Sequence, residues 1–96
     1  MQLTFEVGIV REALALRRAG LPAEHPHTAM SLAGYGSFLV DAGRLDEAEP
    51  LLRESLAMRT SLLGDAHHDT AESRSLLGLC LVRRARAGGA AEDMLL

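Results

Sequence analysis

The sequence repeats itself at a spacing of 42 residues. The segment from Arg11 to Arg17 returns from Arg53 to Arg59, and the segment from His25 to Ser31 returns from His67 to Ser73. A period between about 20 and 50 residues is typical of solenoid proteins, in which each repeat buries its apolar face only against its neighbours. The spacing therefore predicts an architecture of stacked, similar units.

The composition favours helices over strands. Hydrophobic residues make up 48% of the 96 positions, but only Phe5, Tyr35 and Phe38 are aromatic. The core must then be built mainly from Leu, Ala, Val and Met, and strands prefer β-branched and aromatic residues whereas Leu, Ala and Met prefer helices. A chain of this length has room for one domain with a modest core. We predict a single all-α domain.

Charge and hydropathy argue against nucleic acid and membranes as partners. The formal net charge is −3 and the pI is near 5.7, whereas nucleic-acid-binding domains are usually basic. The apolar run at 76–82 is far shorter than the roughly 20 residues that span a bilayer. The first residues carry Glu6 and no base, which is unlike a signal peptide. We expect a cytoplasmic protein, and the use of arginine for all ten basic residues suggests a GC-rich bacterial genome.

Apolar residues at helical spacing predict four helices and the start of a fifth. Glycine or a glycine followed by proline ends each of them. The third helix carries Pro50 early, where we expect a slight irregularity. The predicted ranges are 5–18, 28–42, 45 or 46 to 63, 70 to about 84, and a stub that begins at Ala90 after the breaker Gly88-Gly89.

Two further expectations concern the second and fourth helices. The second should bury one face, and its cap should be His27 or Thr28. For the fourth, Asp69 stands three residues before Glu72, which is the spacing of a capping box. The buried face of the second helix is predicted to consist of Ala29, Leu32, Tyr35, Gly36, Leu39 and Val40.

The unit resembles the 42-residue tetratricopeptide repeat (TPR) of the kinesin light chain type. The resemblance rests on the histidine-proline loop that starts at His25, on the string from Asp46 to Leu52 with its Glu-Ala-Glu-Pro-Leu core, and on Leu63-Gly64 at the end. It implies antiparallel helix pairs stacked into a right-handed α-solenoid, here about two repeats in five helices. The implied units are the second helix of a partial repeat at 5–19, a complete repeat at 25–66, and a degenerate, truncated repeat at 67–96.

The same resemblance implies a scaffold without catalysis, whose first-type helices line a groove for a protein or peptide. Opposite the buried face, the second helix would present Met30, Gly34, Ser37 and Asp41. Positions 42 residues later would present Glu72, Leu76, Leu79 and Arg83. Alternatively, Leu76 and Leu79 only contact a neighbouring repeat. The chain departs from the family where an asparagine pair is common, because it has Ala33-Gly34 and Ser75-Leu76 there.

No residue pattern indicates a catalytic site, a cofactor or a metal site. His25, His27, His67 and His68 could form a zinc-like set with Asp65 and Asp69 if stacked loops met, but surface or capping roles explain them better. The serines mostly fall on or beside solvent faces, and Cys80 should be a buried, inert thiol. Arg83, Arg84 and Arg86 form a short basic patch, which either faces solvent at a helix end or contacts an acidic partner.

Two other functional hypotheses follow from the small number of repeats. About three repeats are usually needed for stability, and terminal repeats normally carry a polar face, whereas the last residues here are Met94-Leu95-Leu96. The chain could therefore be a structural part of a longer array in a bacterial signalling protein, for example one attached to a serine/threonine kinase. It could also associate with itself through open solenoid ends.

Overall fold

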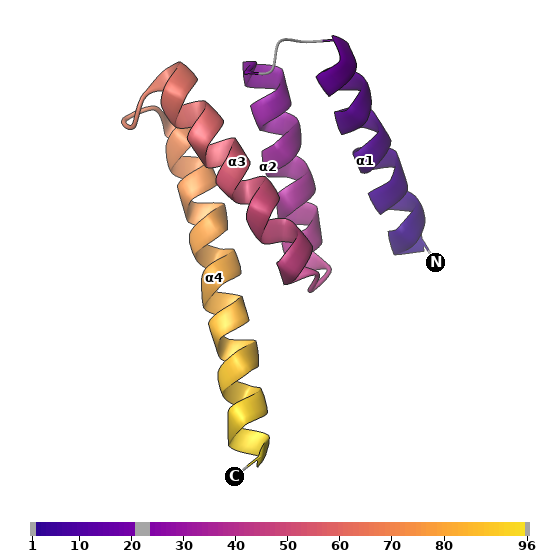
Figure 1. The fold of residues 1–96 in the computed structure, drawn as a ribbon, viewed down its shortest axis with the longest axis vertical. Coiled ribbons are helices and arrows are strands. Elements are labelled where there is room, and N and C mark those ends of the chain that lie inside the picture. The colour runs from indigo at the N-terminus through magenta and orange to yellow at the C-terminus, as the bar shows by residue number, and fades with distance from the viewer. Residues whose placement is uncertain (1, 21–23, 96) are drawn as a thin grey trace.

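Four α-helices make up the described part of the chain. The computed structural model describes the backbone of residues 2–20 and 24–95, and the side chains of residues 11–20 and 24–88. Each helix runs antiparallel to the one before it (Figure 1). The prediction of an all-α domain of antiparallel helices is confirmed. The helices are α1 (Gln2–Gly20), α2 (Pro26–Asp41), α3 (Leu45–Leu63) and α4 (His68–Leu95).

The predicted fifth helix is not seen, because α4 continues without a break to Leu95. Gly88-Gly89 was expected to end it. Glycine in a helix interior costs only about 1 kcal/mol relative to alanine and does not forbid helical backbone angles. The neighbours Ala85, Ala87, Ala90 and Ala91 are the strongest helix formers, so the helix passes through both glycines.

Glycine does end α2 and α3, as predicted. Gly43 and Gly64 have φ angles of 78° and 90°, in the region that favours glycine. At the other end of α2 the predicted cap is wrong. The N-cap is His25, whose Nδ1 accepts a hydrogen bond from the His27 amide at 3.1 Å. Pro26 then opens the helix, where its missing N–H costs least.

The core lies around α2, which packs against α3 and α1, while α4 packs mainly against α3. In Figure 1, α1 and α4 lie on opposite sides of α2. Each helix contributes to one cluster of buried apolar side chains, among them Leu14 of α1, Leu52 of α3 and Cys80 of α4. The face predicted for the second helix is buried throughout: Ala29, Leu32, Tyr35, Gly36, Leu39 and Val40.

The closest approach between α2 and α3 is at Gly36. A Cβ placed there would lie 2.6 Å from Cδ2 and 2.7 Å from Cγ of Leu52. Leu52 itself is fully buried. The glycine that costs helix stability therefore allows the leucine of the facing helix to reach the α2 backbone.

Candidate functional site

The groove residues predicted on α2 lie on the side of that helix away from the core. Met30, Gly34 and Asp41 are exposed, and Ser37 is half-buried. A Cβ added to Gly34 would meet no heavy atom within 4 Å among the described residues. This side of α2 is therefore open along its whole length.

The four equivalent residues of α4 have more mixed surroundings. Leu79 is exposed, whereas Leu76 is half-buried and packs against the core cluster. Glu72 accepts a hydrogen bond from Arg59 at 3.1 Å. Arg83 donates from Nη1 to the main-chain oxygen of Val40 at 3.3 Å, so it joins α4 to the end of α2. Leu79 is thus the apolar side chain of this set that is left free to meet a partner.

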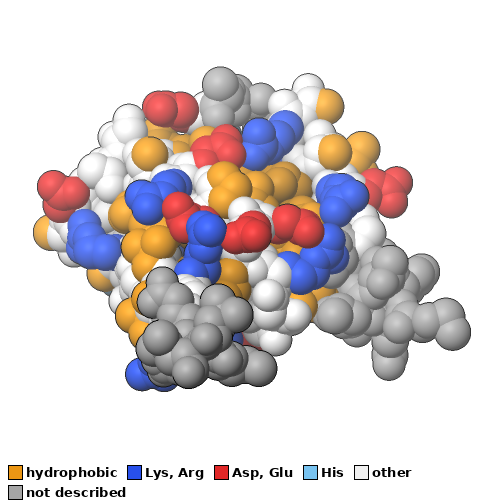
Figure 2. Space-filling model, turned by 60° about the horizontal axis from the view of Figure 1, so that its bottom comes forward, with side chains coloured by type: hydrophobic (Ala, Val, Ile, Leu, Met, Phe, Trp, Pro, Cys, Tyr) orange, Lys and Arg blue, Asp and Glu red, His pale blue; other side chains and the backbone are white. Residues whose placement is uncertain are grey.

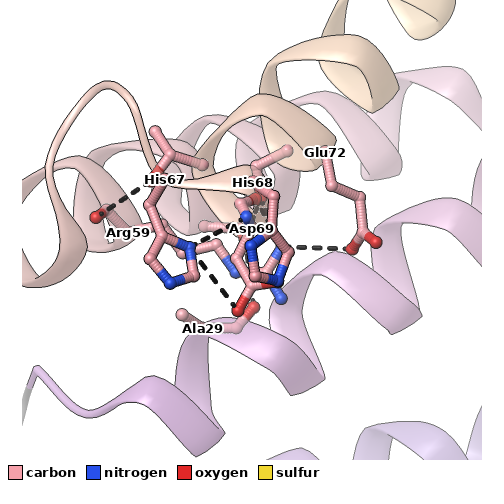
Figure 3. Close-up of polar contacts among 9 residues, drawn as sticks. Ala29, Arg59, His67, His68, Asp69 and Glu72 are labelled. Atoms are coloured by element: carbon pink, nitrogen blue, oxygen red, sulfur yellow. Dashed lines mark hydrogen bonds and ion pairs between the residues drawn. The ribbon is translucent and has the colours of Figure 1, made fainter.

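A buried polar network holds α4 in register with α3. Arg59 is almost fully buried, and its Nη1 donates to the Asp69 main-chain oxygen at 3.0 Å and to Ser73 Oγ at 3.0 Å (Figure 3). On the same side, Thr70 Oγ1 donates to the main-chain oxygen of Arg59 at 3.2 Å. Because a buried guanidinium without partners is costly, these bonds fix the position of α4 relative to Arg59.

The network extends through two serines to α2. Ser55 Oγ donates to the main-chain oxygen of Ala29 at 3.0 Å and lies 2.8 Å from Ser73 Oγ. Since the Ser55 proton is used on Ala29, Ser73 is the donor between the two hydroxyls. Both serines are completely buried, so their predicted place beside solvent is wrong. The bonds connect three helices below the proposed groove and give it a rigid base.

The junction from α1 to α2 repeats part of this arrangement 42 residues earlier. Arg17 Nη1 donates to the His27 main-chain oxygen at 3.2 Å, as Arg59 does to Asp69. His67 also repeats the role of His25, because its Nδ1 accepts the Asp69 amide at 3.0 Å. The cap of α4 is therefore His67 and not Asp69. The recurrence of Arg17 as Arg59 was the sequence signal that could have revealed the network.

The histidines bring together only part of the zinc-like set. Among the described residues, one group has metal-ligand atoms within 4.8 Å of each other: His67, His68 and Asp69. The His67 Nδ1 lone pair in this group already accepts a main-chain N–H. Asp65 instead lies 3.7 Å from the guanidinium of Arg74. The capping bonds account for His25 and His67 without a metal ion.

The basic patch is largely used inside the molecule. Figure 2 shows acidic and basic side chains close together on one end of the bundle, with apolar side chains between them. Arg84 pairs with Asp46 at 2.8 Å and with Glu49, which also accepts from Arg53 at 2.9 Å. These two guanidinium donors hold the pKa of Glu49 below its usual value. The patch therefore fastens α4 to the first turns of α3.

Cys80 is buried, as predicted, and its Sγ donates to the main-chain oxygen of Leu45 at 3.6 Å. Burial raises the pKa of its thiol, and the negative charge of Glu49 adds to this. Such a thiol is protonated and poorly nucleophilic at neutral pH. Cys80 is a packing residue.

Comparison with known proteins agrees with this geometry. Residues 27–94 match the family model described as tetratricopeptide repeat. A search of curated proteins gives no significant match. None of the described helices is long and apolar enough to cross a membrane.

Proposed function

The chain belongs to the tetratricopeptide repeat family, and from this premise we propose that it is a non-catalytic module that binds a partner protein or peptide. The binding surface would be the outer sides of α2 and α4, the first-type helices of two successive repeats. We define the groove face as Met30, Gly34, Ser37 and Asp41 with Glu72, Leu76, Leu79 and Arg83.

One observation carries this proposal. Met30 of α2 and Leu79 of α4 are large apolar side chains that the folded chain leaves exposed on equivalent sides of the two helices. Exposed apolar groups gain free energy when a partner covers them, at about 25 cal/mol for each Å² removed from water. The absence of side-chain amides at 33, 34, 75 and 76 favours apolar contacts over a ladder of hydrogen bonds to a peptide backbone.

The buried network supports the same surface. Binding to a preformed surface avoids the entropic cost of ordering it. The bonds from Arg59 and Ser55 hold α2, α3 and α4 in one register. The groove face is then presented by fixed helices and not by loops.

We infer the finer assignments from the sequence alone. The repeat is of the kinesin light chain type, and further repeats of this geometry would continue a right-handed superhelix. The units are 5–19, 25–66 and 67–96. A bacterial origin and a cytoplasmic location complete the proposal, and they rest on the arginine usage and on the sequence features described above.

Co-purification tests the groove face. The wild-type chain and the double variant Met30→Glu/Leu79→Glu would be used as bait, and the captured proteins identified by mass spectrometry. We expect the double variant to lose the captured proteins, because a partner would have to bury two unpaired carboxylates. Leu62→Glu is the matched control, since Leu62 is an exposed leucine of α3 outside the groove face. Equal capture by the double variant, with unchanged helix content by circular dichroism, would refute the assignment.

A further inference from the structure

The side of α4 that corresponds to the α3-facing side of α2 has no covering helix in the described part of the chain. Leu39 and Val40 of α2 are 0% and 2% exposed. Their counterparts 42 residues later, Leu81 and Val82, are 38% and 48% exposed. The residues are identical in the two helices, so the difference lies in what packs against them.

Gly78 shows the same difference at the level of the backbone. Its counterpart Gly36 lies in contact with Leu52 of α3. A Cβ added to Gly78 would meet nothing within 4 Å among the described residues. The sequence thus keeps the glycine that allows a second helix to approach closely, at a position where the chain supplies no such helix. We call Gly78, Leu81 and Val82 the open face of α4.

The helix α1 has the complementary deficiency. It stands before α2 as α3 stands before α4, since Arg17 and Arg59 make equivalent bonds. Its buried side, marked by Leu14, faces α2. Leu16 is about 200° further round the helix and is 69% exposed, whereas its counterpart Met58 of α3 is 6% exposed.

The end of α4 does not cover the open face. The sequence from Ala91 to Leu95 resembles that from Ala48 to Leu52, at the start of α3. In the structure this stretch continues α4 as one helix and does not turn back onto it. The missing helix must therefore come from elsewhere.

We propose that it comes from a second copy of this chain, which docks head to tail. In this arrangement α1 of one copy packs antiparallel on the open face of α4 of the next copy, in the way that α3 packs on α2. Each copy supplies the helix that the other lacks, so the helix order continues without interruption from one copy to the next. Leu16 would be buried against the segment that carries Leu81 and Val82.

The composition of α4 sets the strength of this contact. Arg74 and Ser75 occupy the places of the buried Leu32 and Ala33 of α2. Only the second half of the open face is apolar, and so the contact between copies is weaker than the one between α2 and α3. We expect reversible association that depends on concentration. Because the two surfaces differ, the contact is heterologous and can add further copies.

Sedimentation velocity of the full chain over a wide concentration range tests the proposal. We expect the wild type to form dimers and longer assemblies as the concentration rises. Leu16→Glu and Val82→Glu each place a carboxylate on one of the two surfaces, and each alone should weaken association about tenfold or more. Met30→Glu is the control, because Met30 is similarly exposed but lies on the groove face. Circular dichroism of each variant checks that helix content is retained.

A mixture of the two variants gives the sharpest result. Leu16→Glu keeps its α4 surface and Val82→Glu keeps its α1 surface, so together they should form one-to-one dimers that grow no further. Loss of association in Val82→Glu alone, with no effect of Leu16→Glu, would instead indicate pairing of α4 with α4 and would refute the head-to-tail contact. A wild-type chain that stays monomeric throughout would also refute it, and would leave the open face to another helix, such as one in a longer array. Neither result bears on the groove face.

Discussion

Replacing Gly36 by alanine should destabilise the protein, although alanine is the better helix former. Alanine in a helix interior is favoured over glycine by about 1 kcal/mol. Against this gain stands the close contact with α3, because the new Cβ would lie 2.6 Å and 2.7 Å from Cδ2 and Cγ of Leu52. Rotation of a terminal methyl group cannot relieve the contact with Cγ. Leu52 is fully buried, so α2 and α3 must move apart.

Overpacking of this kind typically costs about 1 to 3 kcal/mol. The net effect of Gly36→Ala is then a loss of about 0 to 2 kcal/mol in the free energy of unfolding. Gly34→Ala is the matched control two residues earlier, since a Cβ at Gly34 meets no atom within 4 Å among the described residues. It should raise the free energy of unfolding by up to about 1 kcal/mol. The two variants should differ by about 1 to 3 kcal/mol.

Urea unfolding followed by far-ultraviolet circular dichroism measures this difference. The protein should be kept at low concentration, so that association does not contribute to stability. Gly78→Ala adds a second comparison, because it should stabilise the monomer as Gly34→Ala does and yet weaken the proposed contact between copies. If Gly36→Ala unfolded at the same urea concentration as Gly34→Ala, the close approach of α2 and α3 would be wrong.

Two further predictions concern the polar contacts. Thr70→Val should lower the free energy of unfolding by about 1 kcal/mol, because it removes the buried bond to the main-chain oxygen of Arg59, whereas Thr28→Val should be neutral or stabilising in the same urea assay, since the buried Thr28 hydroxyl has no hydrogen-bond partner among the described residues; equal losses would contradict the network. The pKa of Glu49 is lowered in the folded state from 4.5 by Arg53 and Arg84, so the stability from these pairs is present above that pH and is lost as the pH falls through the lower folded value. The melting temperature of Glu49→Gln should therefore decrease less than that of the wild type between pH 6 and pH 3, and parallel curves would exclude a contribution from Glu49.

The parts of the fold that were predictable are those set by local chemistry. The buried face of α2 follows from a spacing of three and four residues and from its repetition. The ends of α2 and α3 follow from Gly43 and Gly64, because a left-handed backbone conformation is costly for other residues. Each of these features depends on a few neighbouring positions, which the sequence displays directly.

The continuation of α4 through Gly88-Gly89 was not predictable in this way. Glycine lowers helix stability without setting an alternative conformation, so the same pair can end a helix or lie inside one. In Gly43 the positive φ makes the turn explicit only once the structure is known. The repeat also favoured a break here, because the next unit should have begun near Ala90.

The burial of Ser55, Ser73 and Arg59 is a tertiary property. A polar residue is buried where partners on other helices satisfy its hydrogen bonds, and the spacing within one helix says nothing about those partners. The sequence offered one indirect signal, since arginine recurs at 17 and 59 and serine at 31 and 73. For the groove face, by contrast, the sequence places residues on a side of a helix, while the structure adds that Glu72 and Arg83 already bind within the chain.

The two junctions between successive repeats are copies in sequence but not in bonding, and this difference bears on the proposed association. At the α1–α2 junction, Met30 replaces the carboxylate of Glu72 and Ala13 replaces the hydroxyl of Ser55, so Arg17 keeps only the bond to the His27 main-chain oxygen among its described contacts. In a solenoid, stability is approximately a sum of the repeats' own stabilities and the interfaces between neighbours. We therefore expect α1 to be held less firmly than α4. A second copy that buries Leu16 would give α1 another neighbour, and by linkage association would then stabilise the weakest helix of the fold.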